Sequence, residues 1–379
     1  MSSSTSSPLP TTMRALCVEV QGQPLTVKTI PTPQPGPGSL IVKVLAVSID
    51  PNIQDIIDGN VPYLYTPMPF IPGGDAIGRV VAAGPDTTTL CSGQLVMIES
   101  CVRGRDNSDV QVLWGMGVFG QDPKATKLIE VWRDGLLAEY VRAPLENVYA
   151  LNEKRLMGSP TEGGLGYSLG ELSLLTRHLV AYGGLRGIDL KPGETVIVAP
   201  ATGLFSSAAV EVASAMGACV VAVSRNLPKL QKLASANQRV EIVQTSGNYE
   251  EDLEKIKAFG PIDAYLDISP KEANGSSHVR ACLMSLKNYG RASLMGVLTN
   301  DIDISYMMAV LKNLTIWGQY MYERKDVRGL IGLIESGLLK LGKVGGNEIV
   351  GGFSIEQWDE GLKVAVQNAG PGKTVVMYL

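Results

Sequence analysis

The sequence is poor in the residues that bind metals and form disulfides. It contains five cysteines and two histidines among 379 residues. The cysteines are scattered and odd in number, and none has a Cys-x-x-Cys spacing: Cys17, Cys91, Cys101, Cys219 and Cys282. A disulfide framework needs paired cysteines and a zinc ribbon needs closely spaced ones, so neither is expected. We predict free thiols in a reducing compartment.

Features that direct a chain to membranes or nucleic acids are also missing. No apolar run is long enough to cross a bilayer. The formal net charge of −4 at pH 7 gives no basic footprint for nucleic acid or anionic lipid. The opening MSSSTSSPLPTT has neither the basic region nor the apolar core of a signal peptide. We therefore predict a cytoplasmic protein with a disordered tail over residues 1–12, and no nucleic acid or membrane as partner.

What the sequence does have is the length and composition of two α/β domains. A chain of 379 residues with 45% hydrophobic residues exceeds one ordinary domain and fits a globular protein. From Met13 to about Gly164, runs such as SLIVKVLAVSI alternate with turn segments such as PTPQPGPGS. This pattern predicts a β-rich domain. The long polar loop 101–133 has a length that often carries function.

The pattern changes near Leu165 to alternating strands and helices. Apolar runs such as TVIVA and AYLDIS alternate with helical patterns such as SSAAVEVASAMGA and HVRACLMSLKNYG, as far as Gln319. This alternation predicts a doubly wound parallel sheet of the Rossmann type, with right-handed crossovers. Residues 320–379 give two helices and a strand, and we expect this tail to fold back onto the first domain. The predicted domains are 13–164 with 320–379, and 165–319.

The first strand of the predicted sheet leads into a turn suited to a dinucleotide. A GxxGxxG-like turn would place glycines at positions 200, 203 and 206, where this chain has Pro200, Gly203 and Ser206. The middle glycine lets bare backbone approach a pyrophosphate, at which the next helix points its first amides. The alternative is a Rossmann domain that has lost its ligand. The predicted cofactor-binding turn is Pro200, Ala201, Thr202, Gly203, Leu204, Phe205 and Ser206.

The end of the second strand discriminates between the two nicotinamide dinucleotides. NAD binders place a carboxylate there to accept the ribose hydroxyls, whereas a 2′-phosphate requires cations and hydroxyls. The segment VVAVSRNLPK offers Ser224, Arg225 and Lys229, and no carboxylate. Arg225 can bind phosphate through two hydrogen bonds, and Lys229 adds a point charge. We predict NADP(H), the alternative being that both cations are solvated charges at a helix start.

Three motifs in order resemble one large family. The KPGETVIVAPATG turn, the SRN at the second strand end and the GKTVV close, after a β-rich domain, resemble the medium-chain dehydrogenase/reductase superfamily. From Met13 onward the chain looks most similar to zinc-free, quinone-oxidoreductase-like and alkenal-reductase-like members of fungal type. The resemblance implies an α/β fold in which a GroES-like, β-rich catalytic domain and the Rossmann domain enclose an active-site cleft.

The resemblance also identifies where zinc-dependent members hold their metal. This chain has Asp50 for the first cysteine ligand, Gly73-Gly74-Asp75 for the Gly-His-Glu signature, and Leu174 or Leu175 near the third ligand. The four-cysteine structural loop would fall on residues 101–133, which hold one cysteine. A catalytic zinc needs three protein ligands and a structural zinc needs four. No metal is therefore expected.

Zinc-free members of this kind reduce conjugated C=C bonds. The resemblance implies NADPH-dependent reduction of an enone-like or quinone-like C=C, or of a ketone, in a small hydrophobic substrate. A fungal resemblance suggests secondary metabolism. The rival hypothesis is a non-redox descendant of the same fold: a cyclase, an isomerase or a binding protein. Pro200 and Ser206 favour that rival, because both depart from the phosphate-binding motif.

Four residues are candidates for catalysis. The segment SIDPNI resembles the S-x-D-P-Y stretch that lines the nicotinamide in alkenal reductases, which makes Asp50 a candidate acceptor unless it caps the turn. Tyr63 and Tyr65 are candidate proton donors. His178 lies on the helix before the phosphate turn, where it is either catalytic or structural. His278, at a later helix start, is expected to be structural or exposed.

The quaternary structure is left open by the sequence. Gly318 and Gln319 end the last predicted strand of the parallel sheet, where Rossmann-type dimers pair edge to edge. The resemblance implies a homodimer through that edge, and a monomer is the alternative.

Overall fold

The computed structural model describes residues 8–61, 63–120 and 122–379. The chain divides into two compact units. Unit 1 contains Met1–Leu174, Ile349–Asn368 and Thr374–Leu379, and unit 2 contains Leu175–Glu348 and Ala369–Lys373. The chain therefore passes from one unit to the other four times.

Unit 1 is built around a seven-stranded sheet of order β11-β6-β5-β3-β19-β18, with β10 also paired to β3. Its central strand β3 buries most of SLIVKVLAVS, because Val, Leu and Ile lie on both of its faces. The strands are β3 (Ser39–Ser48), β5 (Ala76–Ala83), β6 (Leu95–Ile98), β10 (Tyr140–Pro144), β11 (Val148–Ala150), β18 (Glu348–Phe353) and β19 (Lys373–Tyr378). The β-rich character predicted for the first domain is confirmed.

Short hairpins and helices complete unit 1. The two-stranded pairs are β1 (Thr12–Cys17) with β2 (Thr26–Pro31), β4 (Leu64–Tyr65) with β9 (Val118–Phe119), and β7 (Cys101–Arg103) with β8 (Gln111–Leu113). The helices are α1 (Ile53–Ile57), α2 (Pro123–Val131), α3 (Glu153–Met157), α4 (Leu169–Leu172) and α12 (Trp358–Gln367).

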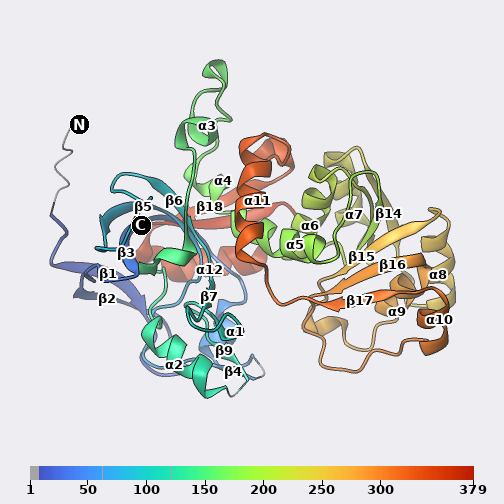
Figure 1. Cartoon of the computed structure of the whole chain (residues 1–379), viewed down its shortest axis with the longest axis horizontal. Helices are drawn as coiled ribbons and strands as arrows, with labels where there is room; N and C mark the ends of the chain where they lie inside the picture. The colour runs from blue at the N-terminus through green and yellow to red at the C-terminus, as the bar shows by residue number, and fades with distance from the viewer. Residues whose placement is uncertain (1–7, 62, 121) are drawn as a thin grey trace. The chain divides into compact units, whose positions relative to one another are not determined.

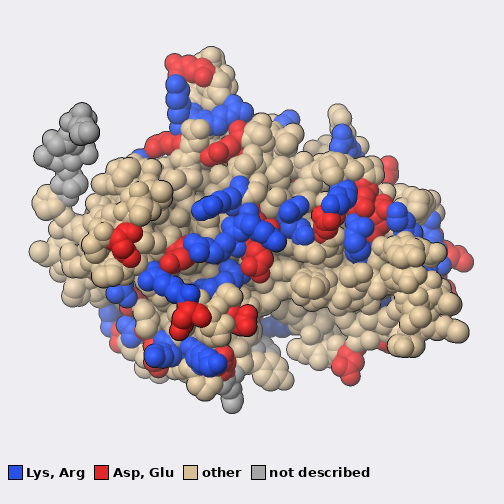
Figure 2. Space-filling model, in the orientation of Figure 1, with Lys and Arg blue, Asp and Glu red and all other residues tan. Residues whose placement is uncertain are grey.

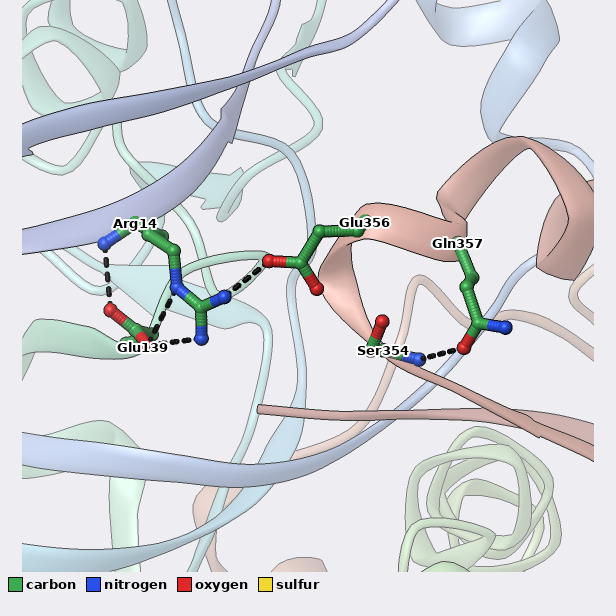
Figure 3. Close-up of polar contacts among 5 residues, drawn as sticks. All are labelled: Arg14, Glu139, Ser354, Glu356 and Gln357. Carbon is green, nitrogen blue, oxygen red and sulfur yellow. Dashed lines mark hydrogen bonds and ion pairs between the residues drawn. The ribbon is translucent and has the colours of Figure 1, made fainter.

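An arginine on β1 joins the start of unit 1 to its C-terminal part (Figure 3). The Arg14 backbone N–H donates to Glu139 Oε2 at 2.7 Å, and its guanidinium donates to Oε1 at 2.7 and 3.0 Å. The same guanidinium binds Glu356 in a 3₁₀ turn, Ile355–Gln357. The turn is itself closed by the Ser354 N–H, which donates to Gln357 Oε1 at 3.1 Å. One cation thus ties three distant segments together.

Unit 2 contains a six-stranded parallel sheet of order β14-β13-β12-β15-β16-β17. The strands are β12 (Thr195–Ala199), β13 (Cys219–Ser224), β14 (Val240–Gln244), β15 (Ile262–Asp267), β16 (Leu286–Leu294) and β17 (Thr315–Gly318). The helices are α5 (Leu175–Gly187), α6 (Leu204–Ala215), α7 (Leu227–Ala236), α8 (Tyr249–Lys257), α9 (His278–Ser285), α10 (Tyr306–Leu311) and α11 (Arg324–Glu335). Figure 1 shows α5, α6 and α7 on one side of this sheet and α8 and α9 on the other.

The strand order of unit 2 reverses between β12 and β15. From β12 the chain runs outward to β13 and β14, then returns to pair β15 on the other side of β12. Ala199 and Asp267, the last residues of β12 and β15, are partners in the register. In doubly wound sheets, ligands bind beyond the carboxyl ends of the strands at such a reversal. Ala199 and Asp267 therefore mark the edge of the sheet at which this fold class binds its ligand.

The unit boundaries differ from the predicted domain boundaries at three places. Residues 165–174 group with unit 1, whereas residues 320–348 and 369–373, predicted with the first domain, group with unit 2. The physical reason is that α11 packs against α5. A Cβ at Gly329 of α11 would lie 2.5 Å from the Tyr182 hydroxyl of α5, so glycine permits this close approach. Of the predicted tail, residues 1–7 lie outside the described residues, and Thr12 already begins β1.

In the part of the chain that the structure describes, no helix is both long enough and apolar enough to span a bilayer.

Candidate cofactor and active site

The predicted phosphate turn follows β12 directly and starts α6. Gly203 is the N-cap of α6, with an extended backbone, and it is exposed. Its N–H donates to the Ser206 hydroxyl at 3.0 Å. Leu204 and Phe205 form the first turn of α6, where backbone N–H groups have no acceptor within the helix. The turn therefore presents helix amides beside a residue without a side chain, as a pyrophosphate site requires.

The two substituted positions of the turn have local explanations. Ser206 stands at the position of the third glycine and is buried. Its hydroxyl accepts a hydrogen bond from the Gly203 N–H, so this serine caps the start of α6. Pro200 has no N–H, and the chain regains the sheet at Ala201, whose N–H donates to the Val223 carbonyl at 2.8 Å. This hydrogen bond holds the turn against the end of β13.

A hydroxyl pair connects the phosphate turn to the end of β13. Thr202 Oγ1 and Ser224 Oγ lie 2.7 Å apart, and Ser224 is buried. Ser224 is the last residue of β13, and the next residue, Arg225, is exposed. The fold thus places the predicted phosphate turn next to Ser224, the first of the predicted 2′-phosphate residues.

Lys229 completes the group of predicted cofactor residues. It lies on the first turn of α7, where its N–H donates to the Asn226 side chain at 3.0 Å. A Cβ at Gly370 would lie 3.1 Å from its Nζ, so the segment 369–373 runs beside this ammonium group. Among the described residues, neither Arg225 nor Lys229 forms an ion pair with a carboxylate. Both cations can therefore bind an anion.

The predicted catalytic residues of unit 1 lie on two local structures. Asp50 follows β3, and its Oδ1 accepts the Asn52 N–H at 2.9 Å and the Asn52 side-chain amide at 3.1 Å. This is the turn-capping role that the sequence left open as the alternative. Tyr63 and Tyr65 lie at the β4–β9 pair and expose 82% and 44% of their surface. Both phenols can therefore meet a ligand.

His178 is buried in unit 2 rather than directed at open space. It is 1% exposed on α5, and its Nε2 lies 2.8 Å from Glu211 Oε2 on α6. The Asn347 side chain donates to the same oxygen at 2.9 Å. The arrangement supports the structural alternative for this histidine. Sequence reasoning missed Glu211 and Asn347, although Glu211 is the single charged residue of the Ala-rich helix α6.

At the positions where the resemblance places zinc ligands, this chain holds Asp50, Gly74 and two leucines. Asp50 caps a turn, and Leu174 and Leu175 are buried apolar residues. A Cβ at Gly74 would lie 2.7 Å from the Trp114 carbonyl oxygen and 2.8 Å from the Ser100 Cβ. A histidine at position 74 would therefore clash with the backbone. Among the described residues, no group of three His, Cys, Asp or Glu side chains could hold a metal ion.

Two domain families match this chain. Residues 36–153, in unit 1, match the alcohol dehydrogenase GroES-like domain. Residues 206–336, in unit 2, match the zinc-binding dehydrogenase domain. Together the two matches span more than half of the chain, in the order found in one superfamily. The chain belongs to the medium-chain dehydrogenase/reductase superfamily. The predicted fold, a GroES-like domain plus a Rossmann-type parallel sheet, is confirmed.

Relatives of this medium-chain protein are dehydrogenases and reductases. It is 25% identical over 324 residues to an alcohol dehydrogenase of Rhizobium meliloti, covering 83% of this chain and 86% of that protein. It is 22% identical over 372 residues to acryloyl-coenzyme A reductase of Metallosphaera sedula, covering 96% and 99%. A solved crotonyl-CoA carboxylase/reductase in complex with NADP is 17% identical with a TM-score of 0.75, covering 99% of this chain and 96% of that one. The chain is thus a member of an oxidoreductase family.

The narrower resemblance stays a prediction. The named relatives are a bacterial and an archaeal protein, so neither the fungal type nor the zinc-free branch follows from them.

Proposed function

We propose that this protein is a zinc-independent, NADP(H)-dependent reductase of an activated C=C bond in a small hydrophobic substrate, with ketone reduction as the nearest variant. The observation that carries the cofactor choice is the end of β13. Ser224 stands where an NAD-binding enzyme would hold a carboxylate, and it is hydrogen-bonded to Thr202 beside Arg225. An acidic residue there would repel a 2′-phosphate, whereas these residues attract it.

Each group of residues has a role in this proposal. The bound cofactor supplies the hydride. The first amides of α6 bind the pyrophosphate, and Arg225 and Lys229 bind the 2′-phosphate. Ser224 fixes Thr202 and so holds the phosphate turn against the end of β13. Tyr63 and Tyr65 are exposed aromatic groups that can contact an apolar substrate or donate a proton.

Reduction of a C=C bond is the activity that best fits a site without zinc. A zinc-dependent alcohol dehydrogenase uses its metal to polarise the carbonyl; at the positions that the resemblance makes equivalent, this chain has a turn-capping Asp50 and a tightly packed Gly74, which supports a mechanism without zinc. The names of two relatives, an acryloyl-coenzyme A reductase and a crotonyl-CoA carboxylase/reductase, describe chemistry at activated C=C bonds. They support an enone-like or thioester-activated alkene as the substrate class.

The cofactor proposal is tested by titration with NADPH and with NADH, followed by the fluorescence of the reduced nicotinamide. We expect NADPH to bind more tightly than NADH. Arg225→Ala removes a charge-assisted interaction of about 1.5–3 kcal/mol, so its Kd for NADPH should rise about tenfold or more, with that for NADH unchanged. Arg239→Ala, an exposed arginine before β14, is the matched control. Tighter binding of NADH would contradict the choice.

The reaction is tested by following NADPH oxidation with a panel of 2-alkenals, enones, quinones and saturated ketones. We expect turnover of the conjugated substrates, unchanged by EDTA. Activity that EDTA abolishes and zinc restores would contradict the zinc-independent mechanism.

A non-redox function is favoured by one observation, the use of the Gly203 N–H by Ser206. That hydrogen bond occupies a backbone N–H that would otherwise donate to a phosphate. Failure of both dinucleotides to bind at millimolar concentration would favour this second function and contradict the first.

A further inference from the structure

A buried chain of hydrogen bonds lies at the carboxyl end of β15. Asp267 ends the strand, and Ser269 Oγ donates to its Oδ1 at 2.5 Å. The second partner of Ser269 Oγ is His278 Nε2 at 2.9 Å, and His278 Nδ1 lies 2.9 Å from Ser276 Oγ. Asp267, Ser269 and His278 expose only 2%, 1% and 7% of their surface. None of these residues was assigned a site role from the sequence.

Chemistry limits the directions of the hydrogen bonds in this network. An ionised carboxylate only accepts, so both Ser269 and Tyr265, whose hydroxyl is 3.0 Å from Asp267 Oδ1, must donate to it. Burial, and then the Asp267 charge, raise the pKa of Tyr265 well above its ordinary value, which keeps the phenol protonated. Ser269 Oγ has one hydrogen, which it gives to Asp267, so it accepts from His278 Nε2. His278 Nδ1 shares a hydrogen bond with Ser276 Oγ, so the imidazole bridges Ser276 and the Ser269–Asp267 pair.

This network of side chains lies at two loops on the carboxyl edge of the sheet. The residues after β15 and after β16 continue to pair, because the Met295 N–H donates to the Asp267 carbonyl at 2.9 Å and the Val297 N–H donates to the Ser269 carbonyl at 2.8 Å. Between them, Gly296 lies so close that a Cβ there would be 2.6 Å from Asp267 Oδ2. His278 starts α9 and joins the loop after β15 to that helix through Ser269; the loop after β16 is linked only through its backbone pairing with that loop.

The position of these loops relative to the reversal of the sheet suggests their role. A dinucleotide binds across the crevice at the reversal, with one half of the molecule over each half of the sheet. The β12–β14 half carries Ser224, Arg225 and Lys229, which suit the adenosine 2′-phosphate. The β15–β17 half is left for the nicotinamide, and the loops tied by His278 lie at its carboxyl edge.

We propose that His278, acting through Ser269 and Asp267, is a positioning residue for the nicotinamide half of the cofactor. The inference rests on the proposed NADP(H) function and adds to it a part of the site distinct from the 2′-phosphate residues. Reacting groups must be held within about 0.5 Å of their productive geometry, so a buried network of hydrogen-bonded side chains is suited to that task.

The experiment compares two ligands that share only the adenosine half. NADPH spans both halves of the sheet, whereas adenosine 2′,5′-bisphosphate occupies only the β12–β14 half. We expect His278→Ala and Ser269→Ala to raise the Kd for NADPH at least fivefold and to leave the Kd for adenosine 2′,5′-bisphosphate within twofold, by calorimetry. His278→Gln, whose amide nitrogen can donate to Ser269, should restore most of the NADPH affinity. Ser285→Ala is the control, because this buried α9 hydroxyl only donates to the Cys282 carbonyl of its own helix.

Each outcome has one meaning. Equal weakening of both ligands, or of neither, overturns the positioning role and leaves a purely structural cluster. If His278→Ala does not fold, Ser269→Ala gives the same comparison, since it removes the hydrogen bond between Ser269 and His278 and keeps the one between His278 and Ser276. A wild-type protein that binds adenosine 2′,5′-bisphosphate but not NADPH contradicts the proposed function itself, before any variant is measured.

Discussion

At the scale of single residues, the sequence predicts charge and hydroxyl chemistry better than it predicts partners. The sequence predicts a cofactor role for Ser224, Arg225 and Lys229 from their place at the end of a strand. Parallel strands all end at the carboxyl edge of the sheet, where ligands bind. His178 shows the opposite case. Its type and helix position suggest catalysis, but its partner Glu211 lies 33 residues away. A pairing at that separation depends on how two helices pack, which periodicity does not encode.

The buried His178–Glu211–Asn347 group yields a stability prediction. Glu211→Ala removes the carboxylate oxygen that the buried His178 ring and the Asn347 amide share, and each buried hydrogen bond lost costs about 1–3 kcal/mol. We expect the free energy of unfolding to fall by about 3 kcal/mol in urea titrations, and by much less in Glu211→Gln, which keeps an acceptor oxygen. Glu241→Ala, an exposed glutamate on β14, should leave it unchanged. Equal stability of the Ala variant and the wild type would contradict a structural role for this group.

Gly74 gives a second residue-scale prediction. Because a Cβ at this position meets the Trp114 carbonyl and Ser100, Gly74→His should destabilise unit 1 without creating a zinc site. Unfolding curves and zinc content by atomic absorption measure the two effects. A folded variant with one tightly bound zinc per chain would contradict our interpretation of this position.

At the scale of elements, strands and helices are predicted well and their ends less well. The predicted helix over 278–290 ends at Ser285, and β16 begins at Leu286. The reason is a distant lysine. Lys312 Nζ donates to the carbonyls of Met284 and Leu286 at 2.7 and 2.6 Å and so caps the helix end. No local pattern contains that information.

The start of α7 couples a helix cap to cofactor choice. Asn226 Oδ1 accepts the Lys229 N–H at 3.0 Å, and a lost cap costs about 1 kcal/mol. Asn226→Ser and Asn226→Asp should both keep the cap and the melting temperature. Asn226→Asp also places a carboxylate next to Arg225, so we expect its Kd for NADPH to rise severalfold relative to Asn226→Ser. An unchanged Kd would show that no 2′-phosphate lies near this helix start.

The ion pairs of Arg14 give unit 1 a pH dependence. Burial alone would raise the pKa of Glu139, but the hydrogen bonds and charge of Arg14 outweigh it and lower the pKa below the ordinary 4.5. The pair therefore stabilises the folded state above that pH, and this contribution is lost as the pH falls through the lowered pKa. For a partly exposed pair we expect about 1 kcal/mol or less.

Urea unfolding between pH 7 and pH 3 measures this dependence. The stability of Glu139→Gln should fall less steeply with acid than that of the wild type. Glu130→Gln, at an exposed position on α2, should follow the wild type. If the free energy of unfolding fell equally steeply with acid in all three proteins, the pH dependence could not be assigned to Glu139.

At the scale of the whole molecule, one surface of unit 2 is unusually apolar. Helix α10 has no buried residue among YMMAVL, and β17 is the last strand of its sheet. The exposed fractions are 83% for Tyr306, 61% for Leu311 and 51% for Trp317. Figure 2 shows the surface around α10 and β17 mostly in tan, with few charged residues. Apolar patches of this kind, next to an unpaired strand edge, mark sites of association.

We expect two copies of the chain to associate through this surface. Sedimentation should then give about twice the chain mass of 40.4 kDa. Leu311→Asp with Trp317→Asp should give a folded monomer, since neither side chain is buried within the chain. Val20→Asp, at an exposed position in unit 1, should remain dimeric. A wild-type monomer at tens of micromolar would contradict the homodimer and support the alternative that the sequence left open.

The chain passes four times between its units, and this path affects the order in which the units can fold during synthesis. Strand β19 (Lys373–Tyr378) lies between β3 and β18 in the sheet of unit 1. A ribosome therefore completes nearly all of unit 2 before it supplies the strand that fills this gap. The nascent β-rich unit must wait with an open sheet edge, which is an aggregation hazard that chaperones would have to cover. In a cell, then, the parallel sheet is available to fold first, although its sequence comes second.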